Sequence, residues 1–244
     1  MVLKKKWGLG ASNLIQPSPK ERALESAFAV IFDMDGTLID NTPYHYKSWK
    51  ELFKKHGKGD LTKETYYTEI SGVPVFQSIK RIFGHDYDNA RLEKLFEEKE
   101  EFYRKAYGPH VKAINGLESL LTDLKAAGVK MAIATSASIT DINFILERIP
   151  IRNYFDEIID SSMVKEPKPS PQIFLKAGEA LNTPSENCVV FEDSLAGIKA
   201  ANSGGMKVVG ITTGHTADEL HPVNLVINDY TTLSAAKMAA LFKN

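Results

Sequence analysis

Short, continuous apolar runs that end in polar residues constrain the fold of this chain more than any other feature. Runs of this length, bounded by turn residues, are typical of strands that are buried on both faces of a parallel sheet. Weaker candidates for further strands lie at 157–160, 208–211 and 225–227. The three clearest runs, with the polar residues that follow them, are 27–32 before Asp33 and Asp35, 129–134 before Thr135 and Ser136, and 188–191 before Glu192 and Asp193.

Helical patterns fill the intervals between these runs. Leucines at 117, 120, 121 and 124 form an apolar stripe at helical spacing, and Gly128 stands where a helix terminus is expected. Further helices are predicted over 139–148, 171–181 and 194–201, with Ser194 as the cap of the last one. This alternation predicts an α/β fold with a Rossmann-like parallel sheet, whose chemistry gathers at the carboxyl ends of the strands.

One segment interrupts the alternation. From about residue 42 to 112 the patterns are helical, and we expect the charged segment 91–105 to present a solvated face. We therefore expect an α-helical cap at 42–111, inserted into an α/β phosphotransfer core formed by 26–41 and 112–244. Residues 1–25 form an amino-terminal extension, in which glycines and polar residues interrupt any apolar core of a signal peptide.

Composition excludes several classes of partner. The 244 residues carry 30 basic and 31 acidic side chains, so the chain has no broad basic field for nucleic acid. No apolar run approaches the ~20 residues of a membrane span. The single cysteine, Cys188, lies in an apolar run and is expected to be a buried strand residue, which fits a cytoplasmic protein. The oligomeric state stays open.

Two pairs of carboxylates follow predicted strands. Asp33 and Asp35 stand at i and i+2, and in an extended segment such residues point the same way. Two nearby carboxylates offer one group for nucleophilic attack and one for proton transfer. Glu192 and Asp193 follow another strand and suit a hard cation with oxygen ligands.

Hydroxyl and ammonium groups complete a phosphate site. Thr135 and Ser136 can donate to phosphate oxygens at the end of their strand. Lys165 and Lys168 lie in a proline-rich loop, from which a lysine can neutralise both a phosphate and the carboxylates. A phosphate dianion approaches a carboxylate only when cations offset the repulsion, so this set of residues indicates cation-assisted phosphoryl transfer.

The ordered motifs resemble those of the haloacid dehalogenase superfamily over residues 28–244. The residues that carry this resemblance are Asp33-Met34-Asp35-Gly36-Thr37, Thr135, Lys168 and Glu192-Asp193, together with the helical insertion after the first strand. Within the superfamily, the chain looks closest to beta-phosphoglucomutase and its phosphatase relatives.

The resemblance assigns roles to these residues. It implies that Asp33 is the nucleophile and a magnesium ligand, and that Asp35 is the general acid/base and binds the metal through its backbone carbonyl. It also implies that Thr135 and Lys168 hold the phosphoryl group. Asp193 would complete the Mg²⁺ site, and Glu192 would lie close behind Asp193 in that site. True dehalogenases lack the second aspartate, so Asp35 favours phosphoryl transfer over carbon–halogen cleavage.

The cap resembles that of the same group. Tyr44 and His45 match the start of its cap, where the histidine lies near the active site, and Gly72 belongs to a loop that resembles the substrate-selecting loop. The mutases of this group carry an arginine and a lysine where this chain has Val75 and Ser138. Neither replacement binds a phosphate dianion through charge, and the alternative that stays open is a contact from Lys80 or Arg81 in the next turn of the helix.

The expected function is a magnesium-dependent phosphatase that hydrolyses a small phosphate ester, such as a sugar phosphate, through an aspartyl-phosphate. The alternatives are a beta-phosphoglucomutase-type mutase, an inorganic pyrophosphatase, and an inactive binding protein on the same fold. The expected partner is a small phosphorylated metabolite, without nucleic acid or membrane.

Overall fold

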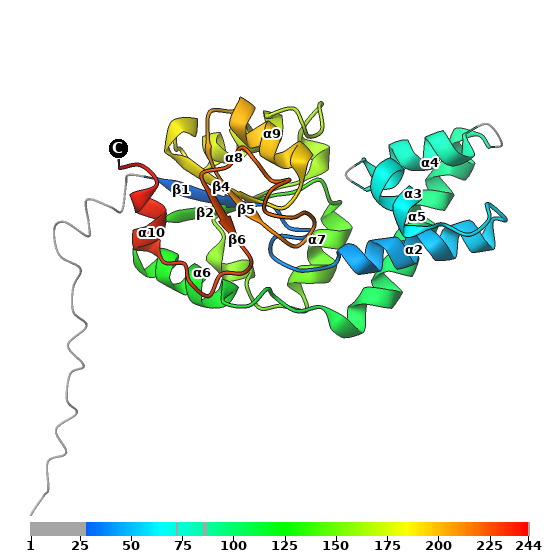
Figure 1. Ribbon diagram of the computed structural model, residues 1–244, viewed down its shortest axis with the longest axis horizontal. Coiled ribbons are helices and arrows are strands. Elements are labelled where there is room, and N and C mark those ends of the chain that lie inside the picture. The colour runs from blue at the N-terminus through cyan, green and yellow to red at the C-terminus, as the bar shows by residue number, and fades with distance from the viewer. Residues whose placement is uncertain (1–27, 72, 85–86, 244) are drawn as a thin grey trace, which may run out of the picture.

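A six-stranded, fully parallel sheet forms the centre of the computed structural model, which describes residues 28–71, 73–84 and 87–243 (Figure 1). The sequence-predicted extension at 1–25 and the loop residue Gly72 lie outside this range. In spatial order the strands are β3 (Glu157–Ile159), β2 (Lys130–Ala134), β1 (Ala29–Phe32), β4 (Cys188–Glu192), β5 (Lys207–Ile211) and β6 (Leu225–Ile227).

The strand register brings the loops that follow β1, β2 and β4 to one edge of the sheet. Phe32, the last residue of β1, pairs with Ile133 of β2 on one side and with Phe191 of β4 on the other. The polar residues that follow these strands therefore leave the sheet at nearly the same level. Such a carboxyl edge is where open α/β sheets place their ligand sites.

Helices cover both faces of the sheet, as an α/β fold requires. One face carries α6 (Leu117–Ala126), α7 (Ile139–Leu146) and α10 (Ala235–Ala240), and the other carries α8 (Gln172–Ala180) and α9 (Leu195–Ser203). Side chains of β1 alternate between the two layers: Val30 and Phe32 pack in the first, Ala29 and Ile31 in the second. Burial on both faces explains why the strands read as unbroken apolar runs.

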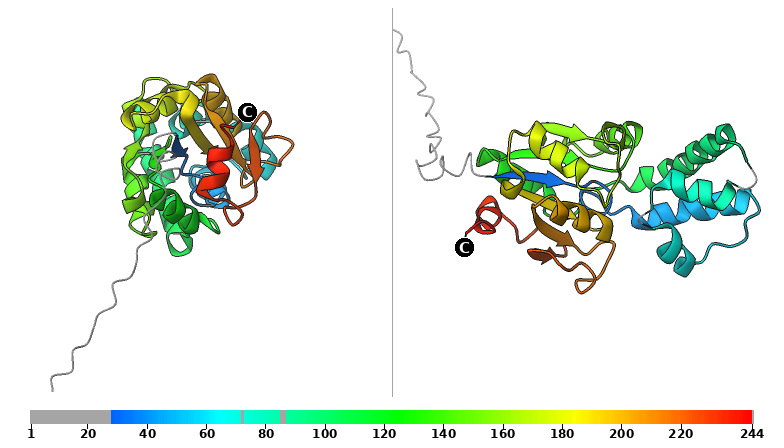
Figure 2. Two further views of the ribbon diagram at one scale, coloured as in Figure 1. Left: turned by 90° about the vertical axis from the view of Figure 1, so that its left-hand side faces the viewer. Right: turned by 90° about the horizontal axis from the view of Figure 1, so that it is seen from above.

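Between residues 42 and 110, every element that the structure describes is a helix, and loops join these helices. The helices are α2 (Thr42–Lys55), α3 (Lys63–Thr65), η1 (Tyr66–Ile70), α4 (Val75–Phe83), α5 (Asn89–Tyr107) and η2 (Gly108–His110). They enclose their own apolar cluster, to which α2 contributes Trp49, α4 contributes Ile79 and α5 contributes Leu95. This helical insertion lies beyond the carboxyl edge of the sheet (Figure 2). The division into domains at 42 and 111 stays a prediction.

Two chain segments connect the insertion to the sheet. They touch through an antiparallel bridge between Ile39 and Ala113 and a hydrogen bond from the Ile114 amide to the Leu38 carbonyl (3.0 Å). Helix α5 also enters the sheet's apolar layer, because Tyr103 and Tyr107 belong to that cluster. The insertion is therefore packed onto the core through its longest helix.

Several local predictions are confirmed. Gly128 follows α6 with φ +72°, the left-handed conformation that a helix terminus favours. Ser194 caps α9 by accepting a hydrogen bond from the Gly197 amide (3.0 Å). Cys188 is a free, buried thiol in β4. Among the described helices, none combines the length and apolar character needed to cross a membrane.

Candidate active site

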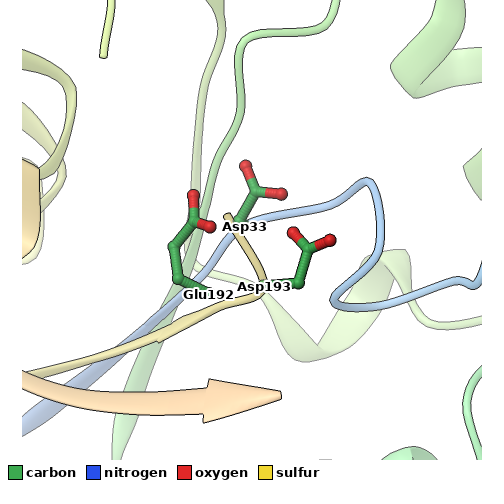
Figure 3. Close-up of side chains that lie close together, drawn as sticks. All are labelled: Asp33, Glu192 and Asp193. Atoms are coloured by element: carbon green, nitrogen blue, oxygen red, sulfur yellow. The ribbon is translucent and has the colours of Figure 1, made fainter. Parts of the chain in front are cut away.

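Three carboxylates converge at the carboxyl edge of the sheet. Asp33 follows β1, and Glu192 and Asp193 lie at the end of the neighbouring strand β4 (Figure 3). One oxygen atom from each lies within 4.8 Å of the others. The parallel pairing of Phe32 with Phe191 causes this, because the residues after each strand leave the sheet side by side.

Lys168 lies between two of these carboxylates. Its ammonium donates to Asp33 Oδ1 and to Glu192 Oε1, both at 2.6 Å, and its side chain is only 7% exposed. Lys165, from the same loop, is exposed and contacts Gln172 through its backbone amide. Of the two lysines that the sequence offers, Lys168 is the one that enters the site.

The remaining oxygen of Glu192 is held by the start of α9. Glu192 Oε2 accepts from the Ser194 amide (2.8 Å) and from the Ser194 hydroxyl (2.9 Å). A Cβ on Gly197 would lie 1.8 Å from Glu192 Oε1, so only glycine leaves room for this carboxylate. Both oxygens of Glu192 therefore have protein donors.

Two glycines make room for Asp193. A Cβ on Gly36 would lie 2.1 Å from Asp193 Oδ2, and one on Gly214 would lie 2.6 Å from the same atom. Gly36 also has φ +75°, which a side chain rarely adopts. Thr213, next to Gly214, donates from its hydroxyl to the Gly36 carbonyl and joins the two loops.

The electrostatics of this cluster favour a cation. Burial, together with the negative charges of Glu192 and Asp35, outweighs Lys168 and raises the pKa of Asp33 to about 8. Burial and the negative charges of Glu192, Asp33 and Asp35 raise the pKa of Asp193 well above its ordinary value. One lysine does not balance this buried negative charge. A hard divalent cation with oxygen ligands fits both the charge and the donor atoms.

The Asp35 carboxylate points to different partners from that of Asp33. Its Oδ1 accepts from Asn41 Nδ2 at 2.5 Å and lies 4.0 Å from His45 Nε2. The strand that the expectation extends through both aspartates ends at Phe32, and Asp35 forms an isolated bridge with Ile39 instead. Burial raises the pKa of Asp35, but the interactions with His45 and Asn41 outweigh it, and the pKa lies below its ordinary value.

His45 is held by a buried lysine of helix α5. Lys99 Nζ lies 3.0 Å from His45 Nδ1 and donates to Glu100 Oε1, also at 3.0 Å. The imidazole stacks on Tyr103, with 4.2 Å between the ring centroids. The other ring nitrogen, Nε2, lies 3.2 Å from Asn41 Nδ2, so both ring nitrogens of His45 have protein partners.

Lys99 and Glu100 correct the expectation that 91–105 is simply a solvated face, because both side chains are buried. Sequence reasoning missed them, and it also missed Asn41. The spacing of Leu92, Leu95 and Lys99 follows i, i+3, i+7, which places the lysine on the buried stripe of α5. That position within the helix is the signal that could have identified Lys99.

The other sequence-predicted residues have varied environments. Thr135 is buried, and its hydroxyl accepts from the Ala137 amide (3.1 Å), whereas Ser136 is exposed. Tyr44 packs on Tyr107, with ring centroids 4.6 Å apart, near the segments that connect insertion and core. The contribution of Gly72 lies outside the described residues.

Comparisons with known proteins agree with this geometry. The sequence profile of the family described as haloacid dehalogenase-like hydrolase matches residues 30–211. The phosphorylated carbohydrates phosphatase of Thermotoga maritima is 32% identical over 73% of this chain and 82% of its own length. The beta-phosphoglucomutase of Bacillus subtilis is 31% identical over 76% of this chain and 84% of its own length.

A solved structure extends the similarity to three dimensions. A haloacid dehalogenase hydrolase of family IA, variant 3, from Entamoeba histolytica superposes with a TM-score of 0.82 at 31% identity, and covers 89% of this chain and 100% of its own. Family profile, relatives and fold therefore agree.

Proposed function

Because the chain belongs to the haloacid dehalogenase-like hydrolase family and is a phosphohydrolase, we propose that it hydrolyses a sugar phosphate or a similar small phosphate ester through an aspartyl-phosphate at Asp33. The observation that carries this proposal is the buried contact of Lys168 with both Asp33 and Glu192. It orients a carboxylate nucleophile beside a cation that can neutralise an incoming phosphate.

In the first step, a carboxylate oxygen of Asp33 attacks phosphorus while the bond from phosphorus to the ester oxygen breaks. Asp35, whose pKa is held below its ordinary value by His45 and Asn41, must take up a proton before this step and then gives it to the departing oxygen. In the second step, Asp35 accepts a proton from water, which attacks phosphorus and breaks the bond to Asp33. Thr135, Ser136 and Lys168 hold the phosphoryl oxygens.

The residues that would hold Mg²⁺ are Asp33, the backbone carbonyl of Asp35, and Asp193. Glu192, which the sequence also assigns to the metal site, acts in this proposal through Lys168 and Ser194, its partners at both oxygens. When bound, Mg²⁺ supplies positive charge to the transferring phosphoryl group. The glycines at 36 and 214 support this assignment, because they leave Asp193 space beside the nucleophile.

The insertion positions the acid/base group. Asn41 and His45 contact or face the Asp35 carboxylate, and Lys99 fixes the ring orientation of His45. We propose that the insertion acts as a cap, which excludes water from the phosphate and selects the substrate through Tyr44, His45 and the loop around Gly72.

A mutase is the second candidate, and the similarity to beta-phosphoglucomutase supports it. Hydrolysis fits better for one reason beyond the missing lysine. The Ser138 hydroxyl bonds to Asp141 Oδ2 (2.8 Å) and accepts from the Asp141 amide (3.2 Å), so it is engaged within its own helix terminus. A mutase needs a firm hold on a second phosphate, and a hydroxyl engaged in this way beside a carboxylate offers none.

A substrate panel tests the proposal. It contains fructose 1-phosphate, glucose 6-phosphate, phosphoglycolate, pyrophosphate and p-nitrophenyl phosphate, each assayed with Mg²⁺ and with EDTA. We expect release of phosphate from at least one sugar phosphate with Mg²⁺ and none with EDTA. Full activity in EDTA would contradict the metal assignment.

The mutase alternative is tested separately. The protein is given beta-glucose 1-phosphate with catalytic glucose 1,6-bisphosphate and Mg²⁺, and glucose 6-phosphate and free phosphate are followed separately. Efficient formation of glucose 6-phosphate with little free phosphate would establish the mutase and overturn the hydrolase.

A cytoplasmic location is also proposed. It rests on the lone cysteine, Cys188, whose thiol is buried in β4 and whose pKa is raised by burial to about 11. Such a thiol is unreactive and suits a reducing compartment.

A further inference from the structure

Two consecutive residues of helix α5, Tyr103 and Arg104, contact different parts of the candidate active site: the surroundings of Asp35 and the start of helix α7. The Tyr103 hydroxyl lies 2.6 Å from Asn41 Nδ2, and Asn41 in turn donates to the Asp35 carboxylate. The next residue, Arg104, donates from Nη1 to Asp141 Oδ1 at 2.9 Å, in helix α7 of the core. One turn of α5 therefore contacts both Asn41, which donates to the Asp35 carboxylate, and Asp141, in the first turn of the core helix α7.

Asp141 connects this contact to the phosphate-binding loop. Its second oxygen, Oδ2, accepts from the hydroxyl of Ser138, and Ser138 ends the loop that begins at Thr135. The Asp141 amide also donates to the Ser138 hydroxyl, which caps α7. Both oxygens of one carboxylate are therefore used, one toward the core loop and one toward the insertion.

Burial distinguishes this ion pair from an exposed pair such as Lys50 with Asp60, whose side chains are 41% and 81% exposed. Asp141 is 7% exposed, and the Arg104 side chain is 25% exposed. Exposed pairs contribute little, whereas removing one partner of a shielded pair leaves a charge without compensation. The apolar contact beside it, between Tyr103 and Phe144 with ring centroids 6.3 Å apart, has no comparable directional preference.

We propose that Arg104 and Asp141 are positioning residues that hold α5 against the phosphate-binding loop, so that Asp35 and the phosphoryl group keep the separation needed for proton transfer. This inference rests on the proposed phosphatase function. Neither residue needs to touch the substrate, because Arg104 acts through Asp141 and Ser138 on the loop, and through its neighbour Tyr103 on Asn41 and Asp35.

The leaving group provides the kinetic test. The second-order constant kcat/KM covers the steps up to departure of the leaving group. A sugar alkoxide needs a proton from Asp35, whereas p-nitrophenolate leaves without one. In Arg104→Gln we expect kcat/KM for fructose 1-phosphate, or the fastest sugar phosphate of the panel, to fall on the order of 10- to 100-fold. The value for p-nitrophenyl phosphate should fall by no more than about threefold.

Two further variants serve as controls. Lys105→Gln removes the same charge from the next, exposed residue of α5 and should leave both substrates unaffected. Arg104→Lys keeps the charge and should restore most of the activity toward the sugar phosphate. Equal losses on both substrates, or a loss in Lys105→Gln as large as in Arg104→Gln, would overturn the positioning role.

Hydrogen exchange tests the same coupling without activity. In Arg104→Gln, the backbone amides of 135–146 and of 39–47 should exchange about fivefold faster than in the wild type and in Lys105→Gln. Unchanged exchange in both segments would overturn the inference. If the wild type hydrolyses none of the phosphate esters, the proposed function fails, and the exchange measurement still decides whether the pair couples the insertion to the loop.

Discussion

At the scale of single residues, the active site depends on contacts that leave no space for other side chains. Lys168 lies between two carboxylates, and glycines at 36, 197 and 214 occupy the places where a Cβ would meet the Glu192 or Asp193 carboxylate. The site therefore depends both on the positive charge of Lys168 and on the space that the glycines leave for the carboxylates, and each can be changed by a substitution.

Replacing Lys168 tests the charge. Lys168→Met leaves Asp33 and Glu192 buried without their cation, and we expect kcat to fall on the order of 100- to 1,000-fold. Lys165→Met is the matched control, since it removes an exposed lysine from the same loop. Steady-state kinetics on the best sugar phosphate measures both variants. A Lys168→Met enzyme within a few-fold of the wild type would contradict the assigned role.

Replacing Gly197 tests the space. The new Cβ in Gly197→Ala would meet the Glu192 carboxylate at 1.8 Å, so the carboxylate or α9 must move. We expect a loss of about 1–3 kcal/mol of unfolding free energy together with most of the activity. In Gly204→Ala, at the other end of α9, the nearest atom is 3.4 Å away, and both quantities should be nearly unchanged. Urea unfolding and kinetics report the two effects, and equal behaviour of the two variants would count against the close contact.

At the scale of elements, the sequence predicts what depends on local order and misses what depends on tertiary partners. The strands were predictable because burial on both faces produces unbroken apolar runs. The motif residues other than Lys168 were predictable because they follow those runs directly. The partners of the Asp35 carboxylate could not be predicted, because the strand ends before this residue. The contact between Arg104 and Asp141 could not be predicted either, because they are 37 positions apart and their charges resemble any other surface charges.

Ser194, the N-terminal capping residue of α9, connects this helix to the candidate active site, because its hydroxyl also donates to Glu192. Ser194→Ala removes the cap and the hydroxyl donor to Glu192 Oε2, while the backbone amide donor remains. We therefore expect a loss of about 1 kcal/mol of stability and a several-fold loss of kcat. Ser234→Ala removes the equivalent cap from α10, which covers the sheet away from the carboxyl edge. It should cost similar stability and no activity. A parallel loss of activity in both variants would show that helix stability alone is responsible.

At the scale of the whole molecule, a helical insertion with its own apolar cluster lies over a sheet whose edge carries excess negative charge. Burial, together with repulsion among the carboxylates, raises the pKa values of Asp33 and Asp193. Binding of a cation should therefore stabilise the folded protein as a whole.

Removing Asp193 tests this coupling. Mg²⁺ at 100 times its Kd should stabilise the wild type by about 2.7 kcal/mol. Asp193→Asn should lose most of this gain and should melt at or above the wild-type temperature in EDTA, because one repelling charge is gone. Glu118→Gln, on the exposed face of α6, is the control with the same change in charge. Thermal melts with and without Mg²⁺ decide, and an undiminished Mg²⁺ response in Asp193→Asn would refute the metal assignment.

The central claim is that phosphate passes through Asp33, and rapid-quench trapping tests it most directly. The protein is mixed with Mg²⁺ and a ³²P-labelled sugar phosphate that it hydrolyses, then quenched in acid within one turnover, and the acyl phosphate is reduced with borohydride. We predict that ³²P is covalently bound after the quench, that it is lost on reduction, and that the reduced residue maps to position 33. Asp33→Asn should show neither label nor turnover. Turnover without a covalent label, or a label on any other residue, would contradict the account.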